Sequence, residues 1–101
     1  QKPFLDSVPD RTCEDDKFRI TFAEGNYGAL IEWDGFTATH TGDGWLGQKA
    51  TGKKITMRDA DLYLRVDDKL TENWCYMDVV DVLLQMGVDV FAKLKAGDYC
   101  K

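Results

Sequence analysis

The feature that most constrains the fold is a two-residue alternation of apolar and polar side chains that recurs between residues 18 and 77. In the first run, apolar side chains at Phe18, Ile20 and Phe22 alternate with polar ones. Side chains of a β-strand point alternately to opposite faces of the sheet, so this run predicts a strand with one apolar face. Similar runs follow at 27–33, 36–41, 55–57, 62–66 and 70–77. The chain is therefore expected to be mainly β, with about six or seven short strands.

Turn residues separate these runs and indicate where the chain reverses. Glu24–Asn26 and Asp67–Lys69 contain the Gly, Asn and Asp residues typical of tight turns. Asp34–Gly35 is a dipeptide favoured in two-residue hairpin turns, where both central residues have positive φ. A further turn is expected at Arg58–Asp61, whose carboxylates lack the spacing of a calcium-binding loop. Together these turns predict a small antiparallel β-barrel or sandwich meander.

The last quarter of the chain has a helical periodicity instead. Apolar residues recur there at steps of three and four, which predicts one helix over about 78–95 that packs on the sheet. Asp78 is placed to cap its start and Gly97 to end it. An alternative ends the helix near Gly87 and makes 88–94 a final strand. The apolar stripe consists of Val79, Val80, Leu83, Leu84, Met86, Val90, Phe91 and Leu94.

A chain of 101 residues is expected to form a single domain. It divides into an N-terminal arm (1–12), the β-meander (13–77) and the helical tail (78–101). The net charge of -5 disfavours nucleic acid as a partner and favours basic proteins. No stretch is long and apolar enough to form a transmembrane segment. The start at Gln1 resembles a processed N-terminus, which predicts a secreted or periplasmic protein.

Three cysteines, Cys13, Cys75 and Cys100, limit the possible cross-links. With His40 as the sole histidine, they do not provide the closely grouped ligands of a structural zinc site, and neither a metal nor a cofactor is expected. Disulfide bonding in an oxidising compartment is the favoured interpretation, and it leaves one thiol free or bonded to another molecule. Three reduced, buried thiols are the alternative.

The segment 42–54 interrupts the alternation and contains four of the nine glycines. Glycine concentrated in a stretch without periodicity predicts a loop with special backbone geometry, and such loops commonly carry binding groups. We therefore expect a partner-binding surface here, with Trp45 either exposed or folded back onto the core. His40 has no adjacent nucleophile in the sequence, and no catalytic residue is predicted. The candidate partner-binding residues are Trp45, Leu46, Gly47, Gln48, Lys49 and Lys53.

The layout of residues 13–77 resembles the periplasmic and membrane-bound inhibitors of C-type lysozyme. The resemblance rests on Cys13–Asp15, the strand to Phe22, the Asp34–Gly35 hairpin, the Gly-rich loop and Asn73–Cys75. It implies a β-barrel closed by a Cys13–Cys75 disulfide, a loop that enters the cleft of a basic lysozyme, and no enzymatic activity. In that loop Gly47 and Lys49 match the family's Gly and basic positions, whereas Leu46 and Ala50 replace its Ser and Tyr.

An alternative function is a non-catalytic structural or assembly module of the bacterial cell envelope. Residues 55–94 faintly resemble the periplasmic domains of biopolymer-transport proteins. A homodimer formed through Cys100 or through the tail helix fits this alternative, as does a Cys75–Cys100 disulfide.

Overall fold

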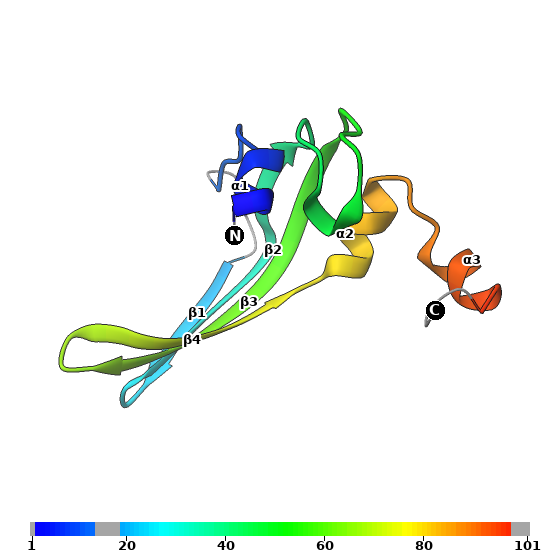
Figure 1. Ribbon diagram of the computed structural model, residues 1–101. Coiled ribbons are helices and arrows are strands. Elements are labelled where there is room, and N and C mark those ends of the chain that lie inside the picture. Colours follow the sequence, from blue (N-terminus) through cyan, green and yellow to red (C-terminus); the bar gives the residue numbers. More distant parts are fainter. Residues whose placement is uncertain (1, 14–18, 98–101) are drawn as a thin grey trace. The chain divides into compact units, whose positions relative to one another are not determined.

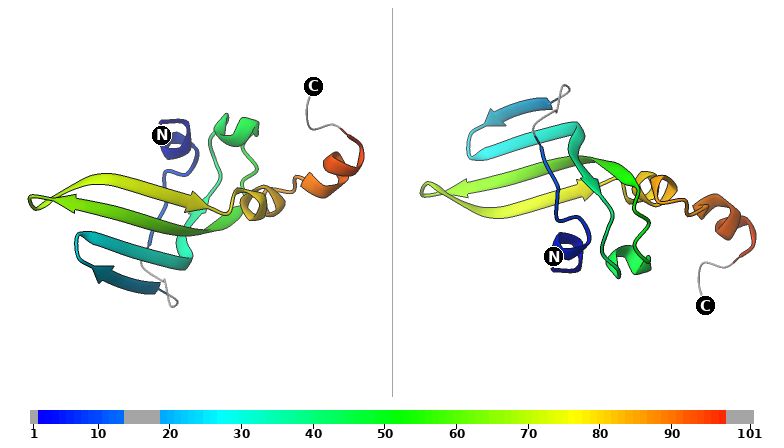
Figure 2. Two further views of the ribbon diagram at one scale, coloured as in Figure 1. Left: turned by 90° about the horizontal axis from the view of Figure 1, so that it is seen from below. Right: turned by 90° about the horizontal axis from the view of Figure 1, so that it is seen from above.

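The computed structural model describes residues 2–13 and 19–97, and its centre is one four-stranded antiparallel sheet with the order β1-β2-β3-β4 (Figures 1 and 2). The predicted mainly β meander followed by helical elements is confirmed, although the described sheet is open rather than closed into a barrel. Within residues 2–13 and 19–97, four strands, two of them long, replace the six or seven short ones expected. The elements are α1 (Lys2–Ser7), β1 (Arg19–Glu24), β2 (Tyr27–Thr39), η1 (Trp45–Gly47), β3 (Lys54–Val66), β4 (Lys69–Met77), α2 (Val79–Gln85) and α3 (Val90–Lys95).

Two of the predicted turns are confirmed. β1 and β2 are joined through Gly25, which has φ 58°. β3 and β4 are joined through Asp67 and Asp68, whose φ values are 48° and 63°. Positive φ at both central residues is the geometry of a type I′ turn, whose twist matches that of the flanking strands.

The hairpin predicted at Asp34–Gly35 is wrong, because β2 runs through both residues. Neither residue has positive φ. A Cβ at Gly35 would lie 2.9 Å from Asp59 Oδ1 and 3.1 Å from Glu32 Cβ. Position 35 is therefore glycine because other side chains approach its backbone closely. Close approach of this kind is a common reason for glycine inside a strand.

The turn predicted at Arg58–Asp61 is also wrong. β3 continues through this segment, and Asp59 and Asp61 pair with Met77 and Cys75 of β4. Clustered carboxylates are disfavoured in strands, but the ladder of a long hairpin overrides that local preference.

The predicted single helix over 78–95 is broken into α2 and α3 at Gly87, which has φ 91°. The alternative placed the break correctly, but the segment after it is a helix rather than a strand. Asp89 caps α3 by accepting a hydrogen bond from Ala92 N at 2.8 Å, and the chain leaves α3 at Gly97 with φ 70°. No helix of the described residues is long and apolar enough to cross a membrane.

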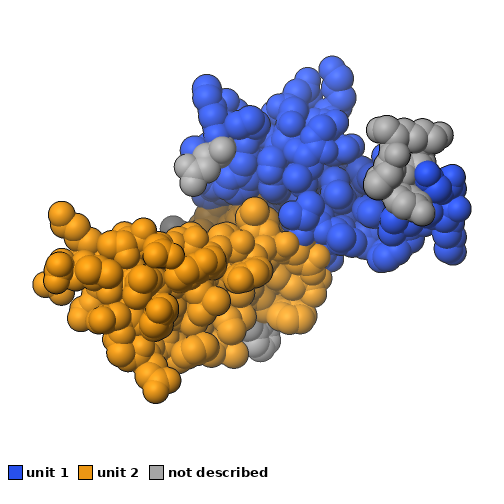
Figure 3. Space-filling view, turned by 60° about the horizontal axis from the view of Figure 1, so that its bottom comes forward, with its two compact units in different colours: residues 1–11, 38–55, 79–101 blue, residues 12–37, 56–78 orange. Residues whose placement is uncertain are grey.

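The contacts divide the chain into two compact units (Figure 3). Unit 1 comprises residues 1–11, 38–55 and 79–101. The N-terminal segment, predicted to be an arm without regular structure of its own, forms the short helix α1 in this unit and is followed by Val8, which is fully buried. Thr41 N and Gly42 N both donate to Ser7 O, at 2.9 and 3.2 Å. The other buried apolar side chains of unit 1 are Ala38, Ile55, Val82 and Met86.

Unit 2 comprises residues 12–37 and 56–78, and it contains most of the sheet. Its buried side chains are few: Ala29, Glu32, Phe36 and Met57. A Thr12–Thr37 bridge extends the sheet beside the far part of β2.

The predicted Cys13–Cys75 disulfide is wrong, because both thiols are free and exposed. Cys13 follows Thr12 at the β1 side of β2, whereas Cys75 lies in β4, beyond β3. Adjacent strands are about 4.8 Å apart, so the two residues are separated by more than the roughly 7 Å of Cα distance that a disulfide spans. Cys100 and Phe18, which enter other predictions, lie outside the described residues.

Candidate active site

One face of the sheet in unit 2 carries a row of polar side chains. Asp59, Asp61 and Tyr63 are alternate residues of β3, so they point to the same face. Across the ladder, Cys75 pairs with Asp61 and Asn73 pairs with Tyr63, which adds two β4 side chains to the row. We call these five residues the Asp61 cluster.

Asp61 is the centre of the cluster because three donors converge on its carboxylate. Asn73 Nδ2 donates to Asp61 Oδ1 at 2.9 Å. The Tyr63 hydroxyl and the Cys75 thiol also form side-chain hydrogen bonds to Asp61. Three donors from two strands fix the orientation of this carboxylate. A side chain that transfers protons must be held in such a fixed orientation.

The same contacts keep Tyr63 and Cys75 protonated at neutral pH. Cys75 is exposed as a residue, but partial desolvation of its thiol, followed by the hydrogen bond and the charge of Asp61, raises its pKa to about 11. Burial and then the charge and hydrogen bond of Asp61 also raise the pKa of Tyr63. Cys75 is therefore a hydrogen-bond donor at neutral pH rather than a nucleophile, since nucleophilic attack requires the thiolate.

A second carboxylate lies beside Asp59. Glu32 of β2 is 7% exposed, and Arg19 Nη2 of β1 is 2.5 Å from Glu32 Oε1. Both Glu32 and Asp59 approach the position that a Cβ on Gly35 would occupy. A buried carboxylate requires an opposite charge nearby, and Arg19 provides it. The described residues contain no group of three side chains placed to hold a metal ion.

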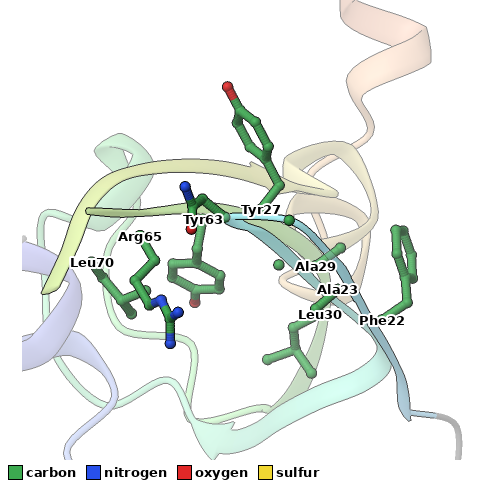
Figure 4. Close-up of a pocket in the computed structure, with 11 residues that line it drawn as sticks. Phe22, Ala23, Tyr27, Ala29, Leu30, Tyr63, Arg65 and Leu70 are labelled. Atoms are coloured by element: carbon green, nitrogen blue, oxygen red, sulfur yellow. The ribbon is translucent and has the colours of Figure 1, made fainter. Parts of the chain in front are cut away.

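A hollow of about 340 Å³ opens in unit 2 and contains Tyr63 in its wall (Figure 4). Leu30, Tyr63 and Arg65 project to one side of the ribbon, whereas Tyr27 points to the other. The volume is at the lower end of the range for small-molecule sites, and its lining is mostly apolar with one cation. The lining residues are Phe22, Ala23, Gly25, Asn26, Tyr27, Gly28, Ala29, Leu30, Tyr63, Arg65 and Leu70.

The loop predicted to bind a partner belongs to unit 1. Trp45 is half-buried, and its ring centroid lies 4.9 Å from that of Phe4, so the folded-back alternative describes it. Leu46 (φ 52°) and Gly47 (φ 69°) have left-handed backbones, and Gln48 Nε2 donates to Leu46 O at 3.1 Å. These contacts give the residues a structural role, and a role in partner binding stays a prediction.

The lysines of this loop are exposed. The Lys49 side chain is 93% exposed and forms only a loose ion pair with Asp43, at 3.7 Å. Lys53 is also exposed, and its Nζ lies 2.8 Å from the position that a Cβ on Gly87 would occupy. Exposed lysines of this kind contribute little to stability.

His40 is a buried structural residue of unit 1. It is fully buried, and its Nδ1 lies 3.0 Å from Thr51 Oγ1. Its backbone N–H donates to Lys53 O at 2.9 Å and its carbonyl accepts from Gly52 N at 2.8 Å. These bonds close the base of the loop.

The open antiparallel sheet and its helical elements place the chain in the α+β class, with an acid cluster beside a hollow in the sheet. The comparison with protein families gives the particular family. The model of the SnoaL-like polyketide cyclase family matches residues 2–86, and this chain belongs to that family. No curated protein matches the chain at a significant level.

Solved structures support this assignment. AclR, a proposed hydroxylase from Streptomyces galilaeus, is 28% identical, with 94% of this chain covered and a TM-score of 0.72. A proposed polyketide cyclase from Acidithiobacillus ferrooxidans is 29% identical, with 85% covered and a TM-score of 0.68. TsrD from Streptomyces laurentii shares the fold at 23% identity and a TM-score of 0.65. This chain spans 61%, 56% and 58% of the lengths of those three proteins.

Family membership overturns the predicted lysozyme inhibitor and the prediction that the chain is not an enzyme. The features that carried the resemblance, a β-meander and a Gly-rich loop, are present in a chain that belongs to the cyclase family, so they do not identify a lysozyme inhibitor. The prediction of a secreted or periplasmic protein rested partly on the disulfide, and it stays a prediction.

Sequence reasoning missed the Asp61 cluster altogether. A signal was present, because Asp59, Asp61 and Tyr63 alternate at period two within an otherwise β-compatible run. Treating the two aspartates as a turn hid the fact that they lie on one face of a strand.

Proposed function

We propose that this chain carries the acid–base centre of a small-molecule cyclase that closes a ring in a substrate with several carbonyl groups. The observation that carries the proposal is the convergence of three donors on Asp61, next to a hollow of about 340 Å³. The family, and the relative from Acidithiobacillus ferrooxidans, support cyclase chemistry. Because the chain spans less than two thirds of its relatives' lengths, the substrate and activity of the whole protein are part of the proposal.

In the proposed reaction the Asp61 carboxylate removes a proton from a carbon flanked by two carbonyl groups. The electron pair of that C–H bond moves onto a carbonyl oxygen and forms an enolate. The enolate carbon then attacks another carbonyl of the same molecule, and a carbon–carbon bond closes the ring. Asp61 returns its proton to the resulting alkoxide, so no atom is lost and no oxidant is needed.

The surroundings of Asp61 fit this task. A general base must be oriented by groups that do not themselves take the proton, and Asn73 and the neutral Cys75 meet this condition. Arg65, which lines the hollow, places a positive charge where an enolate would gain negative charge. The apolar walls at Leu30 and Leu70 suit a carbon skeleton.

The test uses an aryl β-polyketone ester as the probe, with ring closure followed by chromatography and α-proton exchange with D₂O followed by NMR. Asp61→Asn should lower both rates by about 10²–10⁴-fold, the usual contribution of a general base. Asp67→Asn is the matched control, because Asp67 lies in the exposed β3–β4 turn and Asn tolerates its positive φ of 48°. Equal rates for wild type and Asp61→Asn, with the folded structure retained, would refute the role of Asp61.

A further inference from the structure

Tyr63 links the hollow of about 340 Å³ to the Asp61 cluster. It is the one member of the cluster among the described residues that line this hollow. Its side chain points with those of Leu30 and Arg65 to one side of the ribbon (Figure 4). Its hydroxyl is hydrogen-bonded to Asp61. A molecule that fills the hollow therefore contacts Tyr63 directly, and it reaches Asp61 where the hydroxyl of Tyr63 meets that carboxylate.

No other described side chain in the wall of the hollow is suited to donate a proton into it. Besides Tyr63, the polar side chains of the wall are those of Asn26, Tyr27 and Arg65. Tyr27 points to the other side of the ribbon (Figure 4). A guanidinium does not lose its proton in proteins, and the amide of Asn26 has no titratable proton. Proton transfer at the wall is therefore left to the phenol of Tyr63.

The hydrogen bond between Tyr63 and Asp61 has a direction that depends on the protonation of Asp61. Burial, followed by the charge and the hydrogen bond of Asp61, raises the pKa of Tyr63, so the phenol is neutral at neutral pH. An ionised carboxylate only accepts, so the Tyr63 hydroxyl donates to Asp61 in the resting site. Once Asp61 has taken a proton, its own O–H can donate to the Tyr63 oxygen. The hydroxyl hydrogen of Tyr63 is then released towards the hollow.

We propose that Tyr63 is the general acid of ring closure, which donates its hydroxyl proton to the alkoxide that forms when the carbon–carbon bond closes. The inference rests on the proposed function, since Asp61 must first remove a proton from the substrate. The alkoxide oxygen gains the proton of Tyr63, the Tyr63 oxygen gains the proton held by Asp61, and Asp61 becomes a carboxylate again. The proton that Asp61 returns to the substrate thus travels through Tyr63, and no oxidant or reductant takes part.

This role separates two processes at one site. Exchange of the α-proton with solvent requires only that Asp61 removes a proton from carbon and returns one to carbon. Ring closure also requires an acid at the new oxygen, because an alkoxide that is not protonated breaks the new carbon–carbon bond and reverts to the enolate. Without the Tyr63 hydroxyl, the substrate should exchange its α-proton many times for each ring that is closed.

The test measures both processes with the aryl β-polyketone ester, in D₂O by NMR and by chromatography. Tyr63→Phe should slow ring closure by about 10²–10⁴-fold, the usual contribution of a general acid. It should slow α-proton exchange by less than about tenfold, since it removes one hydrogen bond to Asp61 and leaves those of Asn73 and Cys75.

Two matched variants control for the loss of a hydrogen bond and for the loss of a phenol. Cys75→Ala removes another donor to Asp61, one that does not line the hollow, so it should slow exchange and ring closure by the same factor. Tyr76→Phe makes the same chemical change as Tyr63→Phe on the opposite face of the β3–β4 hairpin, and it should leave both rates as they are.

Equal losses of exchange and ring closure in Tyr63→Phe, or an unchanged rate of ring closure, would overturn the role of Tyr63. A fluorotyrosine at position 63 retains a proton to donate, so it should keep ring closure within about tenfold of the wild-type rate. A loss as large as that of Tyr63→Phe would count against the proposal. Asp61→Asn separates the two proposals: if it leaves both rates unchanged, the proposed function itself fails. If Asp61→Asn lowers both rates and Tyr63→Phe is not selective, only the role of Tyr63 fails. Circular dichroism establishes that each variant is folded.

Discussion

The thiol of Cys75 reports directly on the electrostatics at Asp61, and its reactivity can be predicted from the structure. Its pKa is raised from an ordinary 9.0 to about 11. At pH 8 this leaves about a hundredfold less thiolate than an unperturbed thiol has. A thiolate of higher pKa is more nucleophilic, by roughly tenfold for this difference. The net expectation is that Cys75 reacts roughly ten times more slowly than an unperturbed thiol.

The assay is thiol–disulfide exchange with dithiodipyridine in a Cys13→Ser, Cys100→Ser background, so that only Cys75 reacts. Because only the thiolate attacks, the rate should keep rising with pH up to about 11, rather than level off near 9.0. Asp61→Asn removes a negative charge and weakens a hydrogen-bond acceptor, so the pKa of Cys75 should fall and its rate at pH 8 should rise.

The change should be partial, because burial is the largest cause of the shift and it persists in the variant. Asp59→Asn is the matched control. Asp59 acts on Cys75 only through its charge and is the smallest of the causes, so this variant should have a smaller effect. A rate that levels off near pH 9 in the wild type, or that Asp61→Asn leaves unchanged, would show that the carboxylate and the thiol are not in contact.

Two glycine substitutions test close backbone approaches, one within each unit. Gly42→Ala should destabilise the chain by about 2–5 kcal/mol, because the new Cβ would lie 2.7 Å from Ser7 Cα and would displace the N-terminal segment. Urea unfolding and proteolysis of that segment measure the effect, and wild-type stability would contradict it. Gly35→Ala should cost about 1–3 kcal/mol for the close carboxylates beside it. Gly28→Ala, with open space around it and no positive φ, should be close to neutral, so equal unfolding midpoints for these two variants would refute the argument.

The sequence alone determined the class of secondary structure and several chain reversals. Period-two alternation is local, and it predicted the mainly β meander that the structure has. The turn at Asp67–Asp68 followed from residues that tolerate positive φ, and both adopt it. Gly97, with φ 70°, likewise ends the last helix as predicted. Each of these features depends on the backbone preferences of a few adjacent residues.

Tertiary structure decided the features that depend on residues distant in the sequence. Asp34–Gly35 has the composition of a hairpin turn, yet the approach of Asp59 from the neighbouring strand explains its glycine. The cysteine spacing allowed a disulfide, but the intervening strand β3 keeps Cys13 and Cys75 apart.

The candidate site also depends on residues that are distant in the sequence. Asp61 becomes a plausible proton-transferring group only when strand register places Asn73 and Cys75 beside it. Register is set by the whole ladder, since a slip of one residue would turn Asp61 to the opposite face of the sheet. The sequence therefore specified which residues could form strands, whereas pairing between strands specified which of their side chains meet.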